Sequence, residues 1–170
     1  YVSLIQKIDK KYRNFNFITK LFCVHNKIYF IANNKLFCWD HKTIKNWPLN
    51  SPSYCYFFSN ELFVWQKHIG LKILYNDTLK KITGGELFYN KPIRNMLPYD
   101  YKNMLVITKD SGMFLMNIPS LKTKQTSITI RKFPTQADNF LSANNLIYSC
   151  VLKNGTYAFS TSRGGTAIMN

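Results

Sequence analysis

The sequence predicts an all-β protein made of β-propeller blades, and two observations support this. Pairs of short apolar strands joined by a polar turn recur four times, at 27–39, 61–74, 103–115 and 155–169. One turn residue occupies the same place in each pair, namely Lys35, Gly70, Gly112 and Gly165. A strand repeat of about 40 residues is typical of a propeller blade. In addition, aromatic and β-branched residues dominate the apolar set, which favours strands over helices.

Each blade is expected to be a four-stranded, up-and-down antiparallel meander. In the first blade we expect strands at 21–25, 28–31 and 36–39. Asn33 and Asn34 mark a turn, since Asn tolerates positive φ. The opening residues 1–20 are expected to supply an outer strand and a connection. Two prolines within 47–52 indicate a link to the next blade.

The other blades follow the same pattern. Strands are expected at 54–58, 62–65, 71–75 and 79–82, then at 93–97, 104–108 and 113–116, and finally at 146–152, 157–160 and 166–169. The third blade carries extra polar residues between Pro119 and Ala137, and a helical turn is expected at 137–144. Asn154-Gly155 is a strong hairpin signal.

These patterns predict a single propeller segment of about four blades. The approximate blade limits are 1–47, 48–89, 90–134 and 135–170. A closed ring of four blades is tight, whereas an open arc leaves strand edges and blade faces exposed. We therefore expect a piece of a larger ring, completed by the rest of the propeller or by a second chain, such as another copy in a homodimer.

The net charge is +15, from 23 Lys and Arg against 8 Asp and Glu. This charge has two interpretations, a surface that attracts anions or a compositional bias toward lysine. Nucleic-acid binding is not expected, because only four of the cations are Arg. The Arg guanidinium makes paired hydrogen bonds to phosphates and base edges, which the Lys ammonium does not. One local basic cluster stands out, consisting of Lys7, Lys10, Lys11, Arg13 and Lys20. No apolar stretch approaches the length of about 18 residues that spans a membrane.

Catalytic and metal chemistry find little support. The four cysteines form no CxxC pair and lie in apolar strands, so we expect buried free thiols and no zinc site. The three histidines form no HExxH motif, and no carboxylate pair is placed for glycosidase chemistry. We therefore predict a protein without catalytic residues, bound metal or cofactor.

Aromatic and polar residues gather at the predicted turns, which suits a sugar or another polar ligand. The candidate ligand-binding residues are Trp65, Lys67, His68, Tyr99, Tyr101, Lys109, Asp110 and Arg163. Ordinary blade packing is the competing interpretation for Trp65, and a solvated turn is the competing interpretation for Arg163.

Five short motifs occur in a fixed order in the second half of the chain. They are Gly84-Gly-Glu-Leu-Phe88, Met96-Leu-Pro-Tyr99, Leu105-Val-Ile-Thr108 with Ser111-Gly-Met-Phe-Leu115, Ala137-Asp-Asn-Phe-Leu141 and Thr161-Ser-Arg-Gly-Gly165. Together they resemble the regulator-propeller repeats in the ligand-binding sensor domains of bacterial two-component regulators. The resemblance covers roughly residues 62–170. One departure is Lys35, which stands where the other repeats have a turn glycine.

The resemblance implies a seven-bladed ring in the periplasmic part of an inner-membrane sensor. It also implies an oligosaccharide or similar nutrient ligand and a signalling module elsewhere in the parent protein. The alternative is a structural or protein-interaction propeller whose basic surface docks an acidic partner.

Overall fold

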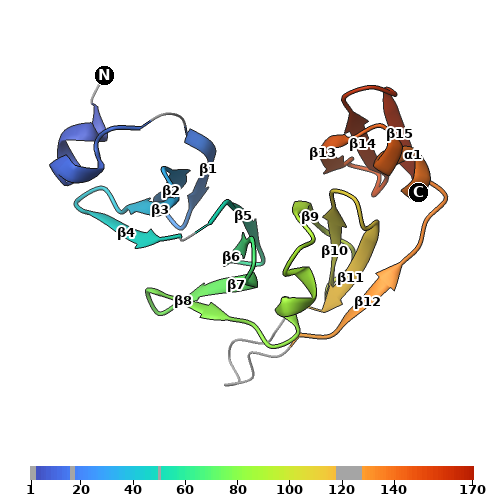
Figure 1. The fold of residues 1–170 in the computed structure, drawn as a ribbon, viewed down its shortest axis with the longest axis horizontal. Helices are drawn as coiled ribbons and strands as arrows, with labels where there is room; N and C mark the ends of the chain where they lie inside the picture. The colour runs from blue at the N-terminus through green and yellow to red at the C-terminus, as the bar shows by residue number, and fades with distance from the viewer. Residues whose placement is uncertain (1–2, 16–17, 50, 118–127) are drawn as a thin grey trace. The chain divides into compact units, whose positions relative to one another are not determined.

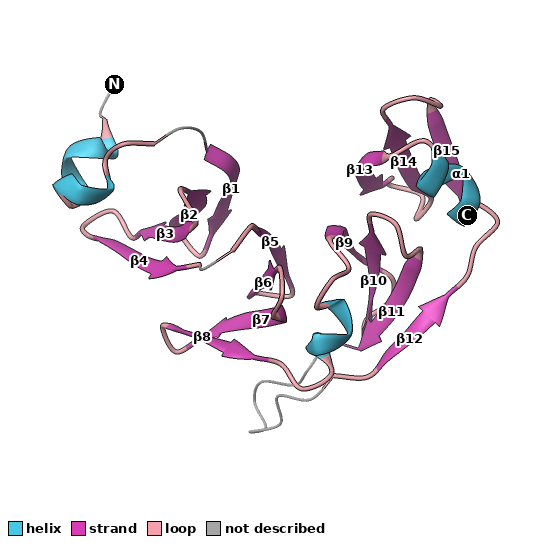
Figure 2. Cartoon of the chain, in the orientation of Figure 1, coloured by secondary structure: helices cyan, strands magenta, loops and turns pink. Residues whose placement is uncertain are grey.

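The computed structural model describes residues 3–15, 18–49, 51–117 and 128–170 (Figure 1). The chain folds as two compact units, unit 1 from Tyr1 to Cys55 and unit 2 from Tyr56 to Asn170. Sheets dominate both units, which confirms the all-β prediction (Figure 2). The four sheets correspond to four propeller blades.

Each sheet is an antiparallel meander in which consecutive strands lie side by side, as predicted. The first blade contains β1 (Ile18–Val24), β2 (Lys27–Ala32), β3 (Lys35–Trp39) and β4 (Ile44–Pro48). The second contains β5 (Ser53–Phe58), β6 (Glu61–Gln66), β7 (Gly70–Tyr75) and β8 (Thr78–Lys81). The third contains β9 (Ile93–Pro98), β10 (Asn103–Thr108), β11 (Met113–Asn117) and β12 (Ile130–Phe133). The last contains β13 (Leu146–Val151), β14 (Tyr157–Thr161) and β15 (Thr166–Met169).

The last blade differs from the predicted four-stranded pattern, since its sheet has three strands among the described residues. The predicted blade limit at 47/48 cuts β4, because the strand continues through Pro48 before the chain leaves the sheet. Pro is tolerated there because β4 is an edge strand and its missing N–H need not serve a neighbour. Completion of a seven-bladed ring by other blades or by a second copy stays a prediction.

The opening segment corrects one expectation. Two 3-10 helices, η1 (Leu4–Lys7) and η2 (Lys10–Tyr12), stand where an outer strand was expected. Ser3 and Asp9 cap these helices, because each side chain accepts a hydrogen bond from the backbone N–H two residues later. Short polar residues therefore turn this segment, and its apolar side chains pack on the first blade through Ile8, Tyr12 and Phe15.

In unit 2, the packing of β10 explains why the sequence of this strand is continuously apolar. Successive strand residues point to opposite faces. Met104 and Val106 pack toward the second blade, whereas Leu105 and Ile107 pack toward the last blade. All four side chains are buried, because this sheet has a neighbour on each face.

Several local features were predicted correctly. Asn33 and Asn34 have positive φ, and Gly155 closes the predicted hairpin with φ of 86°. Helix α1 (Asp138–Ala143) confirms the expected helical turn. The short helix η3 (Gly85–Phe88) and strand β12 were not anticipated. The region that was expected to hold extra polar residues includes β12, while its residues 119–127 lie outside the described part.

All four cysteines are free thiols. Cys38 and Cys55 are buried as expected, Cys150 is half-buried, and Cys23 is exposed. Burial raises the pKa of the Cys55 thiol to about 12. Cys55 is therefore an inert core residue, whereas Cys23 is open to reagents.

Candidate functional site

Three hairpin turns of unit 2 lie at one end of their blades, which we name the turn end. Its turns are residues 67–70, 109–112 and 162–165. The connections between blades join them, since His68 N–H donates to the Tyr89 carbonyl at 2.9 Å and Lys109 N–H donates to the Pro92 carbonyl at 2.8 Å. Ser162 N–H likewise donates to the Asn144 carbonyl at 3.2 Å. The predicted repeat thus places equivalent turns side by side along one edge.

A threonine builds two of these turns in the same way. The Thr108 hydroxyl donates to the Gly112 carbonyl at 2.7 Å and accepts from Ser111 N–H at 3.0 Å. The Thr161 hydroxyl repeats both bonds, to the Gly165 carbonyl at 2.8 Å and from Gly164 N–H at 3.1 Å. Each hydroxyl pairs a turn N–H and adds a second hydrogen bond to a carbonyl that already accepts from the backbone N–H of the same threonine. The turn backbone is therefore fixed before any ligand arrives.

Two of the closing glycines, Gly70 and Gly112, are required by both conformation and space. Gly70 has φ of 99°, and a side chain there would collide with the Gly85 carbonyl of η3. Gly112 has φ of 73°, and its added Cβ would lie 2.9 Å from the Asp138 carboxylate. Each glycine allows the next short helix to cover the preceding turn.

The turn end carries five of the eight predicted ligand-binding residues, namely Lys67, His68, Lys109, Asp110 and Arg163. Lys67, His68 and Arg163 are exposed, and the His68 ring lies 5.4 Å from the Tyr89 ring. Lys109 Nζ lies 3.9 Å from the Asp110 carboxylate. An ion pair this exposed contributes little to stability, so both charges stay open to other partners.

Trp65 does not reach the turn surface. Its side chain is 2% exposed, and its indole N–H donates to the Phe88 carbonyl at 2.7 Å. This bond ties β6 to the end of η3, while the ring packs in the core between the second and third blades. The structure therefore gives Trp65 the packing role that was the competing interpretation.

Tyr99 and Tyr101 lie at the opposite end of the third blade, in the turn between β9 and β10. The Tyr99 ring packs against Phe133 at 5.3 Å, while Tyr101 is 84% exposed. Asp100 shapes this turn by accepting from the N–H groups of Lys102 and Asn103, both at 2.7 Å. The eight residues are thus divided between two ends and the core, and a shared ligand-binding role for them stays a prediction.

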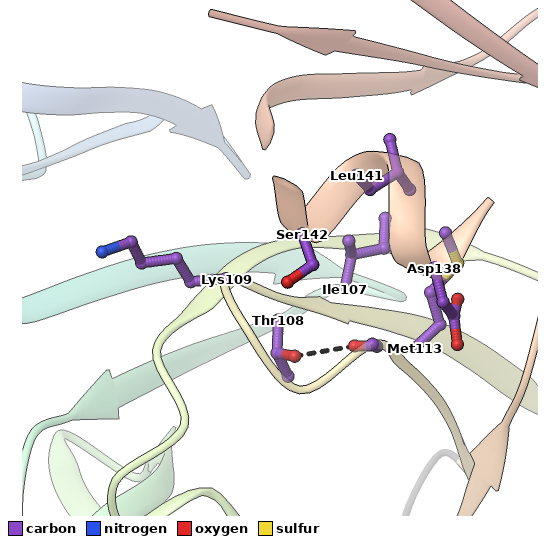
Figure 3. A pocket seen from close by; sticks show the side chains of 8 residues that line it. Ile107, Thr108, Lys109, Met113, Asp138, Leu141 and Ser142 are labelled. Atoms are coloured by element: carbon purple, nitrogen blue, oxygen red, sulfur yellow. Dashed lines mark hydrogen bonds between the residues drawn. The ribbon is translucent and has the colours of Figure 1, made fainter. Parts of the chain in front are cut away.

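A small cavity lies beside the middle turn (Figure 3). Thr108, Lys109, Asp138, Leu141 and Ser142 are among its lining residues. Its volume is about 10 Å³, enough for about one water molecule. In Figure 3 the Lys109 side chain points away from Asp138 and Leu141. This cavity is far smaller than a sugar site.

The charge of the turn end is predominantly positive. Each of the three turns presents one basic residue, Lys67, Lys109 or Arg163. Backbone carbonyls hold two further ammonium groups, since Lys91 Nζ donates to Leu87 O at 2.9 Å and Lys132 Nζ donates to Ser111 O at 3.0 Å. The acidic residues of the same region are Glu86, Asp110 and Asp138. The Glu86 and Asp138 carboxylates accept internal hydrogen bonds, from Gly84 N–H and the Thr135 hydroxyl.

Metal and membrane chemistry gain no support from the described ranges. Within them, no three His, Cys, Asp or Glu side chains gather in a way that could hold a metal ion. Nor does the described part contain a helix with the length and apolar character that crossing a membrane requires.

The sequence already contained a signal that was missed at this site. Thr108 and Thr161 each precede their turn glycine by four residues. That spacing marks a hydroxyl-braced turn, and it aligns the third and fourth repeats more tightly than glycine alone. The helix η3, which covers turn 67–70 of the second blade, is harder to foresee, because its first residue is a glycine.

Comparison with known proteins supports the fold and no more. No family model matches the chain, and no curated protein matches it in sequence. Among 23 matching solved chains is YCF48 from Cyanidioschyzon merolae, with a TM-score of 0.63 and 10% sequence identity. The similarity covers 98% of this chain and 56% of that one, so the chain spans little more than half the length of this neighbour. At this identity the likeness establishes a shared β-propeller architecture.

Proposed function

We propose that this chain is a non-enzymatic propeller that docks an acidic partner protein at the turn end. One observation carries the proposal: three successive blades each present a basic residue on the same turn at the same end, Lys67, Lys109 and Arg163. Repeated blades set these charges along one edge, where they attract and orient an acidic surface.

The physical setting favours a protein partner over a small ligand. Small-molecule sites are concave and enclose most of the ligand, whereas the cavity beside turn 109–112 has a volume of only about 10 Å³. The turn backbones are braced by Thr108 and Thr161, so little ordering is needed when a partner docks. A braced and basic edge suits a macromolecular surface.

Binding to fluorescein-labelled poly-L-glutamate tests this proposal. We expect Lys67→Gln/Lys109→Gln/Arg163→Gln to weaken binding by about tenfold or more at physiological ionic strength. The matched control is Lys80→Gln/Lys81→Gln/Lys153→Gln, which removes the same charge from other exposed positions of unit 2. Equal losses in the two triple variants would show a nonspecific charge effect and refute the proposal. Tighter binding to duplex DNA than to polyglutamate would refute it as well.

A second candidate function is the periplasmic oligosaccharide sensor that the family resemblance implies. The observation that favours it is the exposed Tyr101, beside Tyr99 on a turn braced by Asp100. Such a ring is a platform on which a sugar can stack. Calorimetry with acidic and neutral oligosaccharides tests it. Saturable heat that persists at high salt and disappears in Tyr101→Ala supports sensing, whereas heat lost at high salt in both proteins refutes it.

A further inference from the structure

The first blade carries an open apolar groove in unit 1. Its volume is about 280 Å³, and every residue lining it is apolar. The opening segment contributes Ile5, Ile8 and Phe15, and the sheet contributes Ile18, Leu21 and Phe30. The groove belongs to unit 1, whereas the three turns of the turn end belong to unit 2.

The groove has a preformed floor and an exposed rim. Phe30 and Ile8 at the floor are 6% and 4% exposed, and the Phe15 ring packs edge-on against Phe30 at 6.2 Å. On the rim, Ile5, Ile18 and Leu21 are 41%, 50% and 60% exposed. Single exposed apolar residues are ordinary, but three around one groove indicate an interaction site.

The opening segment is strongly basic. Unit 1 has nine Lys and Arg against two Asp, a net charge of +7. The Arg13 guanidinium donates to the Ile8 and Gln6 carbonyls, at 2.7 and 2.8 Å, and so fixes the segment that forms one wall. Lys7 and Lys10 are exposed on that segment, where Asp9 is the only acid. This charge disfavours a second copy as the occupant and favours an acidic one.

The size of the groove further restricts the kinds of occupant that it can hold. Sites for whole small molecules typically measure about 300–1,000 Å³. At about 280 Å³ and open to solvent, this groove lies at the lower end of that range, and it has room for one or two side chains of a docked segment. Apolar anchors that fill such pockets at the centre of a charged rim are typical of protein–protein hot spots.

We propose that this groove binds an acidic segment of a partner protein, seating its apolar side chains between Ile5 and Leu21. The exposed lysines of the opening segment, Lys7 and Lys10, then face the carboxylates that flank the anchors. Burial of the anchors supplies affinity, and the charges supply orientation.

The test uses a fluorescein-labelled acidic peptide with Leu and Phe anchors and a matched peptide with Ser at the anchor positions. The full chain with Ile18→Ser/Leu21→Ser should bind the anchored peptide about tenfold more weakly. The control Ile147→Ser/Ile168→Ser changes residues of the last blade that are 57% and 58% exposed, and it should change the Kd less than about twofold. Both variants should melt near the parent, because the replaced side chains are at least half exposed.

Three results would overturn the inference. Equal effects of the two double variants would show that the groove is not the site, and equal binding of the two peptides would show that anchors do not matter. Loss of binding to phosphatidylglycerol vesicles with unchanged peptide binding in the groove variant would identify a membrane surface instead. The polyglutamate assay on the turn-end variants reports separately, so failure of one proposal is distinguishable from failure of the other.

Discussion

The third and last blades have the same strand register, but the third blade buries both faces of its sheet and the last blade buries only one among the described residues. Leu105 pairs with Leu115 in the third blade, and Ala158 pairs with Ile168 at the equivalent place in the last blade. Leu105 and Leu115 are buried against the last blade, whereas Ile168 is 58% exposed. The same repeat position is thus a core residue in one blade and a surface residue in the next.

This difference shows what a neighbouring blade does to a sequence. A sheet covered on both faces needs apolar residues at successive positions, as in residues 104–107 of β10. A sheet covered on one face alternates, and β15 follows that pattern with exposed and half-buried residues in turn. Matched substitutions in the two blades test this comparison.

The largest effect is expected for Leu115→Ala. Removing this 2% exposed side chain should lower the free energy of unfolding by about 2–5 kcal/mol, because it leaves a cavity between two blades. The equivalent change Ile168→Ala should cost less than about 0.5 kcal/mol. Urea unfolding of both variants measures the difference. Similar costs would mean that the outer face of the last blade is covered in solution.

The turn glycines should show a smaller difference. Gly165 has φ of 88° and open space around its added Cβ, so Gly165→Ala should cost about 1–2 kcal/mol from backbone strain alone. Gly70→Ala should cost more, because the Gly85 backbone also has to move. Thermal melts of the two variants compare the costs. A Gly70 variant as stable as the Gly165 variant would show that η3 shifts freely.

The threonine braces should behave alike in both blades. Thr108→Val and Thr161→Val each remove a hydroxyl that bonds a carbonyl and an N–H of its turn. Each should lower the free energy of unfolding by about 1–2 kcal/mol, since the turn groups lose a partner. Urea unfolding checks this, with Thr166→Val at an exposed position of β15 as control. A cost at Thr108 only would mean that the last turn is hydrated instead.

The smallest effect concerns pH. Hydrogen bonds from Thr43 N–H and Lys42 N–H lower the pKa of Asp40 to about 2. In a turn of the same type, hydrogen bonds from the Asn103 side-chain amide and Lys102 N–H lower the pKa of Asp100. A lowered folded-state pKa means that the ionised carboxylate stabilises the fold above about pH 4, the usual unfolded value. That contribution is lost as the pH falls from about 4 toward 2. Carboxyl NMR titration of the parent and of Asp40→Asn measures it, and an ordinary pKa at Asp40 would contradict the turn geometry.

The predictable part of this fold lies in its strands and turns. The meanders, the paired asparagines at Asn33 and the Asn154-Gly155 hairpin follow from period-two patterns and local turn chemistry. The opening segment was misread because its apolar residues suggested a strand, whereas the caps at Ser3 and Asp9 turn it into 3-10 helices. The candidate site was predicted only in part. Turn positions identify Lys67 and Arg163, but they do not say which turns share an end.

The sequence alone therefore determined the class of fold, the repeat and the basic charge, because each depends on composition or on spacing along the chain. The tertiary structure decided which side chains became core and which became surface. It buried Trp65 against Phe88, separated Tyr101 from Arg163 and opened the groove beside Leu21. These outcomes depend on contacts between residues far apart in sequence, and periodicity within one strand carries no information about what will cover its face.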